Sequence, residues 1–155
     1  MKNRKPICLP KWVDDDGLQV IMNKETGNIG WIGLGETGHN LAFQLVRAGY
    51  NVTVFDKDRK KAADLEKFGA KVARTANDVA CQSDYLFLCV GSDKNLQNLM
   101  ENSEYGIYDD IKVGSIVINH SPRDADFEYD EKTFLRSKHA TLLDAPIHSP
   151  NDKTH

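Results

Sequence analysis

Ile29-Gly30-Trp31-Ile32-Gly33-Leu34-Gly35-Glu36-Thr37-Gly38 is the stretch that decides the fold of this 155-residue chain. The apolar residues 29–32 predict a buried strand, and the glycines after them have the spacing G-x-G-x-x-G at the start of an amphipathic helix. In that pattern Gly33 permits a tight turn, Gly35 lets the backbone approach a pyrophosphate, and Gly38 lets the helix pack closely on the strand. The N–H groups of the first helical turn then face an anion with the positive end of the helix dipole. The stretch therefore predicts the phosphate-binding corner of a dinucleotide fold.

Downstream of this turn, strand patterns alternate with helix patterns. Strands are predicted at residues 29–32, 51–55, 71–73, 85–90, 115–119 and 141–144, and helices around residues 41–48, 62–68, 75–80, 96–100 and 127–135. Residues 85–90 are apolar throughout, which is typical of a strand in a parallel sheet that helices cover on both faces. Strands that alternate with helices and are joined by short loops predict the α/β class. We expect a Rossmann-type, doubly wound parallel sheet of about six strands.

The chain is predicted to hold one domain with an extension at each end. Residues 1–27 lack sustained periodicity and are expected to form a mobile or loosely docked extension, in which the apolar run 18–22 is a candidate extra strand. Residues 28–146 are expected to form the dinucleotide-binding domain. Residues 147–155 are expected to be a polar tail.

Composition excludes several classes of function. The formal net charge is −3 and the basic residues are mostly scattered, so we expect no nucleic-acid partner. No apolar run approaches the roughly 20 residues that cross a bilayer, so we expect no membrane partner. The three cysteines, Cys8, Cys81 and Cys89, form no CxxC pair, which indicates thiols in a cytoplasmic protein and no metal site.

A carboxylate stands at the end of the second predicted strand. Asp56 follows the glycine turn by about 20 residues, where an acid accepts hydrogen bonds from the adenosine ribose hydroxyls and repels a 2′-phosphate. A second interpretation makes Asp56 the N-cap of the helix that follows, and the two roles are compatible. Lys57, Arg59 and Lys60 come next and could accommodate a 2′-phosphate. The cofactor prediction is therefore NAD, with NADP as the alternative.

Five segments follow one another with the order and spacing of a known family. They are Ile29–Gly35, Ala48–Asp56, Cys89–Asp93, Gly114–Asn119 and Asp144–Pro146. In these segments the chain resembles the β-hydroxyacid dehydrogenases, in particular 3-hydroxyisobutyrate dehydrogenase, which share their cofactor domain with 6-phosphogluconate dehydrogenase. The resemblance implies a nicotinamide cofactor and an oxidoreductase. It also implies a set of cofactor-binding residues: Gly33, Leu34, Gly35, Thr37, Gly38, Asp56, Val90, Gly91 and Ser92, with Asn95 as a further candidate.

Two of these residues have a structural alternative, because Val90 also fits a core position and Ser92 also fits a helix cap.

The chain departs from the family pattern at other positions. Thr37 stands where the family usually has methionine. Ser121 matches a family serine whose position faces the substrate carboxylate. Pro122 stands where the family has threonine. Ser121 is therefore the one substrate-binding residue that the resemblance implies.

The family's catalytic lysine lies on an all-helical domain that follows the cofactor domain. No lysine of this chain occupies a matching position, so we expect no catalytic residue and no turnover by this chain alone. His120 and His148 are expected to be loop histidines rather than proton carriers.

Three hypotheses remain open at this point. The first is a truncated cofactor-binding domain. The second is a split enzyme that a helical domain completes in trans; the expected partners are a dinucleotide and either a second copy of the chain or such a helical domain. The third is a non-enzymatic interaction module or a degenerate fragment.

Overall fold

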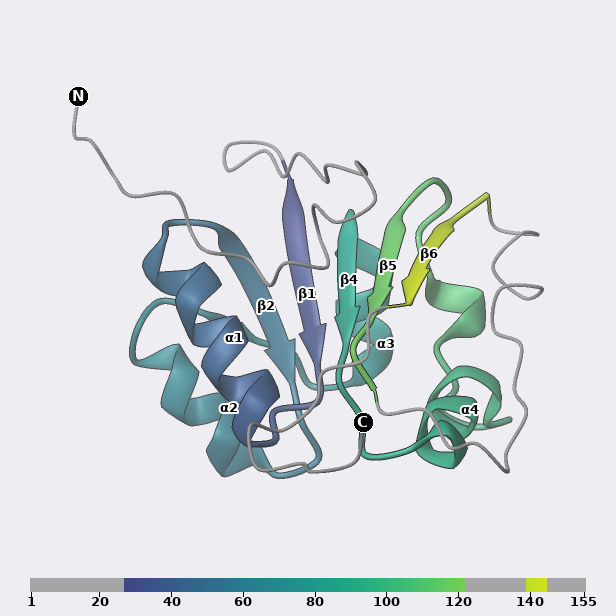
Figure 1. The fold of residues 1–155 in the computed structure, drawn as a ribbon, viewed down its shortest axis with the longest axis horizontal. Coiled ribbons are helices and arrows are strands. Elements are labelled where there is room, and N and C mark those ends of the chain that lie inside the picture. Colours follow the sequence, from purple (N-terminus) through teal and green to yellow (C-terminus); the bar gives the residue numbers. More distant parts are fainter. Residues whose placement is uncertain (1–26, 122–138, 145–155) are drawn as a thin grey trace, which may run out of the picture.

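The computed structural model describes residues 27–121 and 139–144. Its strands form one parallel sheet in the order β3-β2-β1-β4-β5-β6 (Figure 1). Their bounds are β1 Asn28–Ile32, β2 Asn51–Phe55, β3 Lys71–Val72, β4 Tyr85–Leu88, β5 Ile116–Asn119 and β6 Thr141–Asp144. The order confirms the predicted Rossmann-type fold of six strands.

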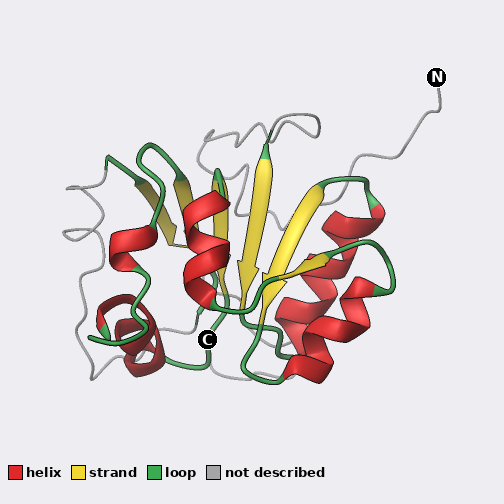
Figure 2. Cartoon of the chain, turned by 180° about the vertical axis from the view of Figure 1, so that it is seen from behind, coloured by secondary structure: helices red, strands yellow, loops and turns green. Residues whose placement is uncertain are grey.

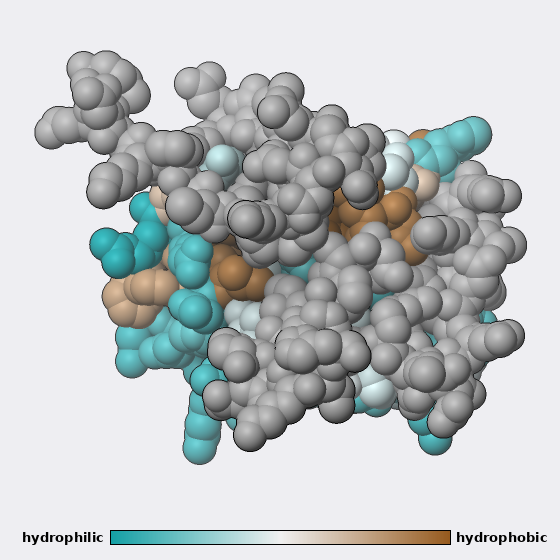
Figure 3. Space-filling model, viewed as in Figure 1, coloured by the Kyte–Doolittle hydropathy of each residue, from teal (hydrophilic) through white to brown (hydrophobic). Residues whose placement is uncertain are grey.

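Helices cover both faces of this sheet. Their bounds are α1 Glu36–Arg47, α2 Arg59–Glu66, α3 Ala76–Gln82 and α4 Asp93–Glu101, with a short 3₁₀ helix, η2, at Tyr108–Asp110. Leu45 of α1 and Leu65 of α2 pack on one face, and Val79 of α3 and Leu96 of α4 pack on the other. Figure 2 shows the second face, with helices in front of the strands. The outer surface over α1 and α2 is mainly hydrophilic (Figure 3), as an amphipathic helix requires.

The ends of the elements differ from the predictions by a few residues. β4 ends at Leu88 rather than at residue 90, and β3 ends at Val72. The second helix begins at Arg59, because the side chain of Asp58 caps it by accepting a hydrogen bond of 3.0 Å from the Lys60 N–H. The interpretation of Asp56 as the N-cap is therefore wrong. The predicted strand 18–22 and helix 127–135 lie outside the described residues.

The strand order creates a crevice at the carboxyl ends of the strands. From β1 the chain moves to β2 and β3 on one side, whereas β4, β5 and β6 lie on the other side. The loops after β1 and β4 therefore leave the sheet in opposite directions. In open α/β sheets, ligands bind in the crevice outside the carboxyl ends of the strands at such a switch point.

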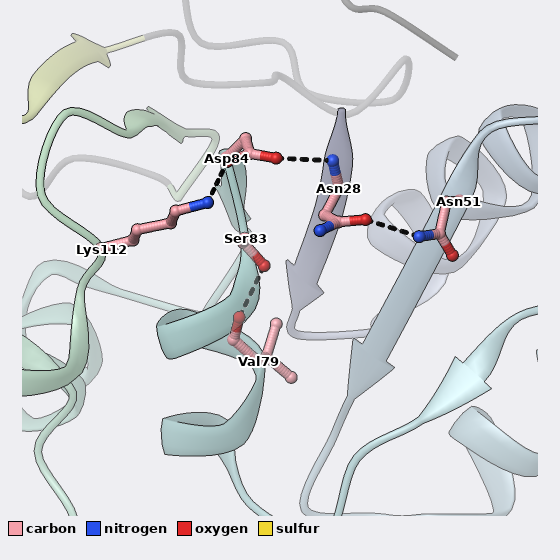
Figure 4. A network of polar contacts seen from close by, with 6 residues as sticks. All are labelled: Asn28, Asn51, Val79, Ser83, Asp84 and Lys112. Atoms are coloured by element: carbon pink, nitrogen blue, oxygen red, sulfur yellow. Dashed lines mark hydrogen bonds and ion pairs between the residues drawn. The ribbon is translucent and has the colours of Figure 1, made fainter. Parts of the chain in front are cut away.

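A polar network joins the strands at their amino ends, opposite this crevice (Figure 4). One oxygen of Asp84 accepts a hydrogen bond of 2.9 Å from the Asn28 N–H, and the other lies 2.5 Å from the Lys112 ammonium. The Asn28 side chain accepts a further bond of 2.6 Å from Asn51. Burial raises the pKa of Asp84, but the Lys112 hydrogen bond, the Asn28 N–H and the Lys112 charge together bring that pKa below its ordinary value of 3.8. The ionised carboxylate therefore stabilises the fold.

Replacing Asp84 with asparagine tests this network. Because the folded-state pKa is lowered, the carboxylate stabilises the fold at neutral pH, and this contribution is lost as the pH falls through the folded-state pKa. We expect Asp84→Asn to lower the free energy of unfolding at pH 7 by about 0.2–1 kcal/mol, the range of exposed ion pairs. Urea unfolding at pH 7 and pH 3 measures the difference, which should shrink at pH 3. Lys112→Met should show the same pattern; a difference independent of pH would contradict it.

Candidate functional site

The glycine turn after β1 is held against the residue that follows β4. Gly33 has φ of 99°, which favours glycine, and a Cβ there would lie 2.2 Å from the Cys89 carbonyl oxygen. The Gly33 N–H donates a hydrogen bond of 3.0 Å to the carbonyl of Phe55 at the end of β2. The turn therefore packs between the end of β2 and the residue that follows β4.

The first turn of α1 packs directly on this glycine turn. A Cβ at Gly38 would lie 2.4 Å from the carbonyl oxygen of Gly33, which excludes a side chain there. The indole N–H of Trp31 donates to the same oxygen at 2.9 Å. Trp31 is fully buried and its ring stacks on Phe87, with centroids 4.8 Å apart. The core below thus fixes the position of the turn.

Gly35 differs from its two neighbours in the motif. Its φ of −64° suits any residue, and a Cβ at this position would meet nothing within 4 Å. Packing within the described residues therefore gives no reason for glycine at this position. The open space in front of Gly35 is a cradle that a side chain would partly fill, as expected where a ligand approaches the backbone.

The helix that starts here offers hydrogen-bond donors to the same space. The His39 N–H makes the first helical bond, at 2.7 Å to the Gly35 carbonyl, and Gly35 as N-cap has no side chain to cap the earlier N–H groups. Such N–H groups, together with the helix dipole, bind anions. The geometry and the donors both fit the pyrophosphate of a dinucleotide.

Asp56 links the end of β2 to the glycine turn. Its Oδ2 accepts a hydrogen bond of 2.7 Å from the Leu34 N–H, and its Oδ1 accepts one of 2.8 Å from the Asp58 N–H. Each carboxylate oxygen retains a further lone pair for a hydroxyl donor. Asp56 therefore fixes the turn and still offers acceptors at its surface.

A cavity of about 750 Å³ lies at this edge of the sheet. It brings together eight of the predicted cofactor residues: Gly33, Leu34, Gly35, Thr37, Gly38, Asp56, Val90 and Gly91. Ser92 does not line it; its hydroxyl caps α4 by accepting a bond of 3.1 Å from the Asn95 N–H. Ser121 is fully buried, and its hydroxyl accepts a bond of 3.0 Å from the Val90 N–H. Ser121 thus holds the loop after β4 in place.

The cavity also contains residues that the sequence interpretation missed. Arg74 and Asn77, near the start of α3, line it, and so does Tyr105 after α4. His120, expected as a loop histidine, is 1% exposed directly after β5, and its ring stacks on Trp31 with centroids 5.6 Å apart. An apolar strand that continues to residue 119 is the one signal that could have indicated burial of His120.

Cys89 lies beside the turn and also lines the cavity. Burial raises the pKa of its thiol. A neutral thiol is a poor nucleophile, because the thiolate is the reactive form. Cys89 therefore contributes packing to this site rather than covalent chemistry.

Comparison with known proteins identifies the family. The model of the NAD binding domain of 6-phosphogluconate dehydrogenase matches residues 28–153. The chain belongs to this family. Its resemblance to the 3-hydroxyisobutyrate dehydrogenase group, predicted from sequence, is confirmed by the relatives described next.

An uncharacterised oxidoreductase of Shewanella frigidimarina is 33% identical over 77% of this chain and 41% of its own length. The Arabidopsis thaliana protein named probable 3-hydroxyisobutyrate dehydrogenase-like 1, mitochondrial, is 30% identical over 82% of this chain and 38% of its own length. The solved 3-hydroxyisobutyrate dehydrogenase of Salmonella typhimurium is 25% identical, with a TM-score of 0.71 over 79% of this chain and 42% of that one. The chain thus spans about 40% of the length of these relatives.

Alanine substitutions at Gly35 and Gly38 should separate binding from folding. Gly35→Ala places a methyl group in open space, so its free energy of unfolding should stay within about 1 kcal/mol of the wild type. The same methyl group should weaken NAD binding about tenfold or more, a cost of at least 1.4 kcal/mol. Gly38→Ala should instead destabilise the fold by about 1–3 kcal/mol, because its Cβ overlaps a backbone oxygen. Urea unfolding and NADH fluorescence titration measure both effects; a Gly35→Ala protein that binds like wild type would contradict the assignment.

Proposed function

We propose that this chain binds a nicotinamide dinucleotide at the carboxyl edge of its sheet, NAD in preference to NADP. The observation that carries the proposal is Gly35, a glycine with no packing reason that faces open space at the uncapped start of α1. Residues 28–146 act as the binding domain in this proposal. The pyrophosphate would accept hydrogen bonds from the N–H groups at the start of α1.

The other cofactor residues take their proposed roles from their places along the cavity. Asp56 would accept hydrogen bonds from the adenosine ribose hydroxyls, and its charge would disfavour a 2′-phosphate. Val90 and Gly91, after β4, would border the adenosine and nicotinamide side. Ser92 and Ser121 would act by holding neighbouring backbone in place, because both hydroxyls already accept backbone hydrogen bonds. A substrate contact by Ser121 stays a prediction from the resemblance.

We propose further that residues 1–155 do not complete a reaction alone. When bound, the nicotinamide would supply or accept a hydride. Proton transfer to or from a substrate hydroxyl needs a group within hydrogen-bond reach, and Lys57, the one lysine among the cavity's lining residues, follows Asp56 at the adenosine end. The family's lysine-bearing helical domain would supply that group, either from the same polypeptide or in trans.

Two further proposals concern partners and location. The alternative of a binding or interaction module without turnover is favoured by the full burial of Ser121, the residue expected to face a substrate carboxylate. A cytoplasmic location is supported by the free thiols Cys81 and Cys89. Among the described residues, the helices are too short and too polar to cross a membrane.

Titration of the purified chain with NADH and NADPH tests the proposal. We expect NADH to bind more tightly, because the charge of Asp56 would repel a 2′-phosphate on the adenosine ribose. Asp56→Ala should weaken NADH binding and remove the preference for NADH over NADPH. Fluorescence of the reduced nicotinamide measures both affinities.

The outcome that would overturn the binding proposal is no detectable binding of either cofactor at millimolar concentration. Turnover separates the remaining alternatives. A panel of 3-hydroxyacids should give no hydride transfer with this chain alone and transfer when a family helical domain is added. A chain that binds NADH but stays inactive with that domain would support the binding-module alternative.

A further inference from the structure

An exposed aromatic side chain stands at one end of the cavity. Tyr105 follows α4, is 45% exposed and lines the cavity together with Leu99. A single exposed apolar side chain needs no explanation by itself, but Tyr105 differs from the exposed Phe68 because it belongs to the cavity lining. The surrounding contacts decide whether this ring is a loose surface residue or a fixed part of the site.

The contacts fix Tyr105 from its own loop and from α4. Its hydroxyl accepts a hydrogen bond of 3.0 Å from the side chain of Asn98, and its N–H donates one of 3.2 Å to the side chain of Asn102. The next residue, Gly106, is also held, because its N–H donates to the Asn102 carbonyl at 2.9 Å. Both ends of the tyrosine are therefore anchored.

A second element holds the same loop. Asn77, in α3, donates hydrogen bonds of 3.0 Å to the Gly106 carbonyl and 2.6 Å to the Asp110 carboxylate. A Cβ at Gly106 would lie 2.5 Å from the Asn102 carbonyl oxygen, so the loop closes tightly. This network presents the ring as a pre-organised surface, which reduces the entropy lost when a ligand binds.

The position of this loop points to one part of the ligand. Arg74 and Thr75 come between β3 and α3, line the cavity, and precede the Asn77 that holds the Tyr105 loop. β3 lies next to β2, whose end carries Asp56. A dinucleotide with its pyrophosphate at the β1 turn and its ribose at Asp56 would place its adenine past the end of β2, in the part of the cavity that Arg74, Thr75 and Tyr105 also line.

The chemistry of this end suits a flat, neutral ring. Leu99 offers apolar surface, Tyr105 offers a π face, and the exposed Arg74 brings a guanidinium that stacks well on aromatic rings. Every nucleobase has a π face that an aromatic side chain can stack on. The hydrogen bond from Asn98 leaves that face available.

We propose that Tyr105 is the stacking platform for the adenine of the bound dinucleotide. This inference rests on the proposed function. It assigns to the adenine site a residue that lies outside the glycine motif and outside the strand ends. Asn98 and Asn77 are then positioning residues that act through Tyr105.

The test compares a ligand that has adenine with one that lacks it. Tyr105→Ala should weaken NADH binding about 5- to 150-fold, as loss of one base–aromatic stack does. The same substitution should leave the affinity for reduced nicotinamide mononucleotide unchanged, because that ligand has no adenine. Tyr105→Phe should keep most of the NADH affinity, since it retains the ring and loses only the bond to Asn98.

Phe68→Ala is the matched control. Phe68 is 55% exposed and packs edge-on against Phe43, 4.9 Å between centroids, away from the cavity lining. It should change neither affinity. Tyr105→Leu provides a folded variant without a π face if Tyr105→Ala does not fold.

Each result decides between the two proposals. A wild-type chain that binds no NADH overturns the proposed function itself. A wild-type chain that binds NADH, with Tyr105→Ala and Tyr105→Leu binding equally well, overturns the role of Tyr105 alone. Equal losses for NADH and the mononucleotide would also overturn it, because the ring would then act through the fold.

Discussion

The close contact between the glycine turn and its surroundings is the constraint on which the rest of the site depends. A Cβ at Gly33 would overlap the Cys89 carbonyl, and one at Gly38 would overlap the carbonyl of Gly33 itself. The indole of Trp31 binds that same carbonyl from the core side. Because the turn is held from three directions, Gly35 and the start of α1 face the cavity in one fixed arrangement. Such pre-organisation removes much of the cost of ordering the site when a ligand binds.

The sheet could be predicted from sequence because its signal is local. The continuous apolar run of β4 and the β-branched run of β2 indicate buried parallel strands, and short loops between alternating elements restrict the topology. The glycine spacing predicted the turn for a similar reason, since Gly33 adopts a positive φ and Gly38 lies against the Gly33 carbonyl. Eight of the nine predicted cofactor residues line one cavity because strand ends in this fold meet at one edge.

The remaining features depend on contacts between residues far apart in the chain. Asp58, rather than Asp56, caps α2 because Asp56 bonds the amide of Leu34, 22 positions away. The Ser121 hydroxyl accepts a hydrogen bond from the Val90 N–H in another loop. Tyr105 lies in a loop with no strand or helix pattern, and Asn77, 29 positions from Gly106, sets its position. Periodicity carries no information about such partners.

Amide chemical shifts can locate the bound dinucleotide, because they report on each backbone N–H separately. We expect NAD⁺ added to the ¹⁵N-labelled chain to shift the amides of residues 34–38 most strongly, with smaller changes at Val90 and Gly91. Amides at the opposite edge, such as that of Asn28, should not move. If saturating NAD⁺ leaves residues 34–38 unchanged, or shifts only residues outside the cavity, the dinucleotide does not bind at the glycine turn.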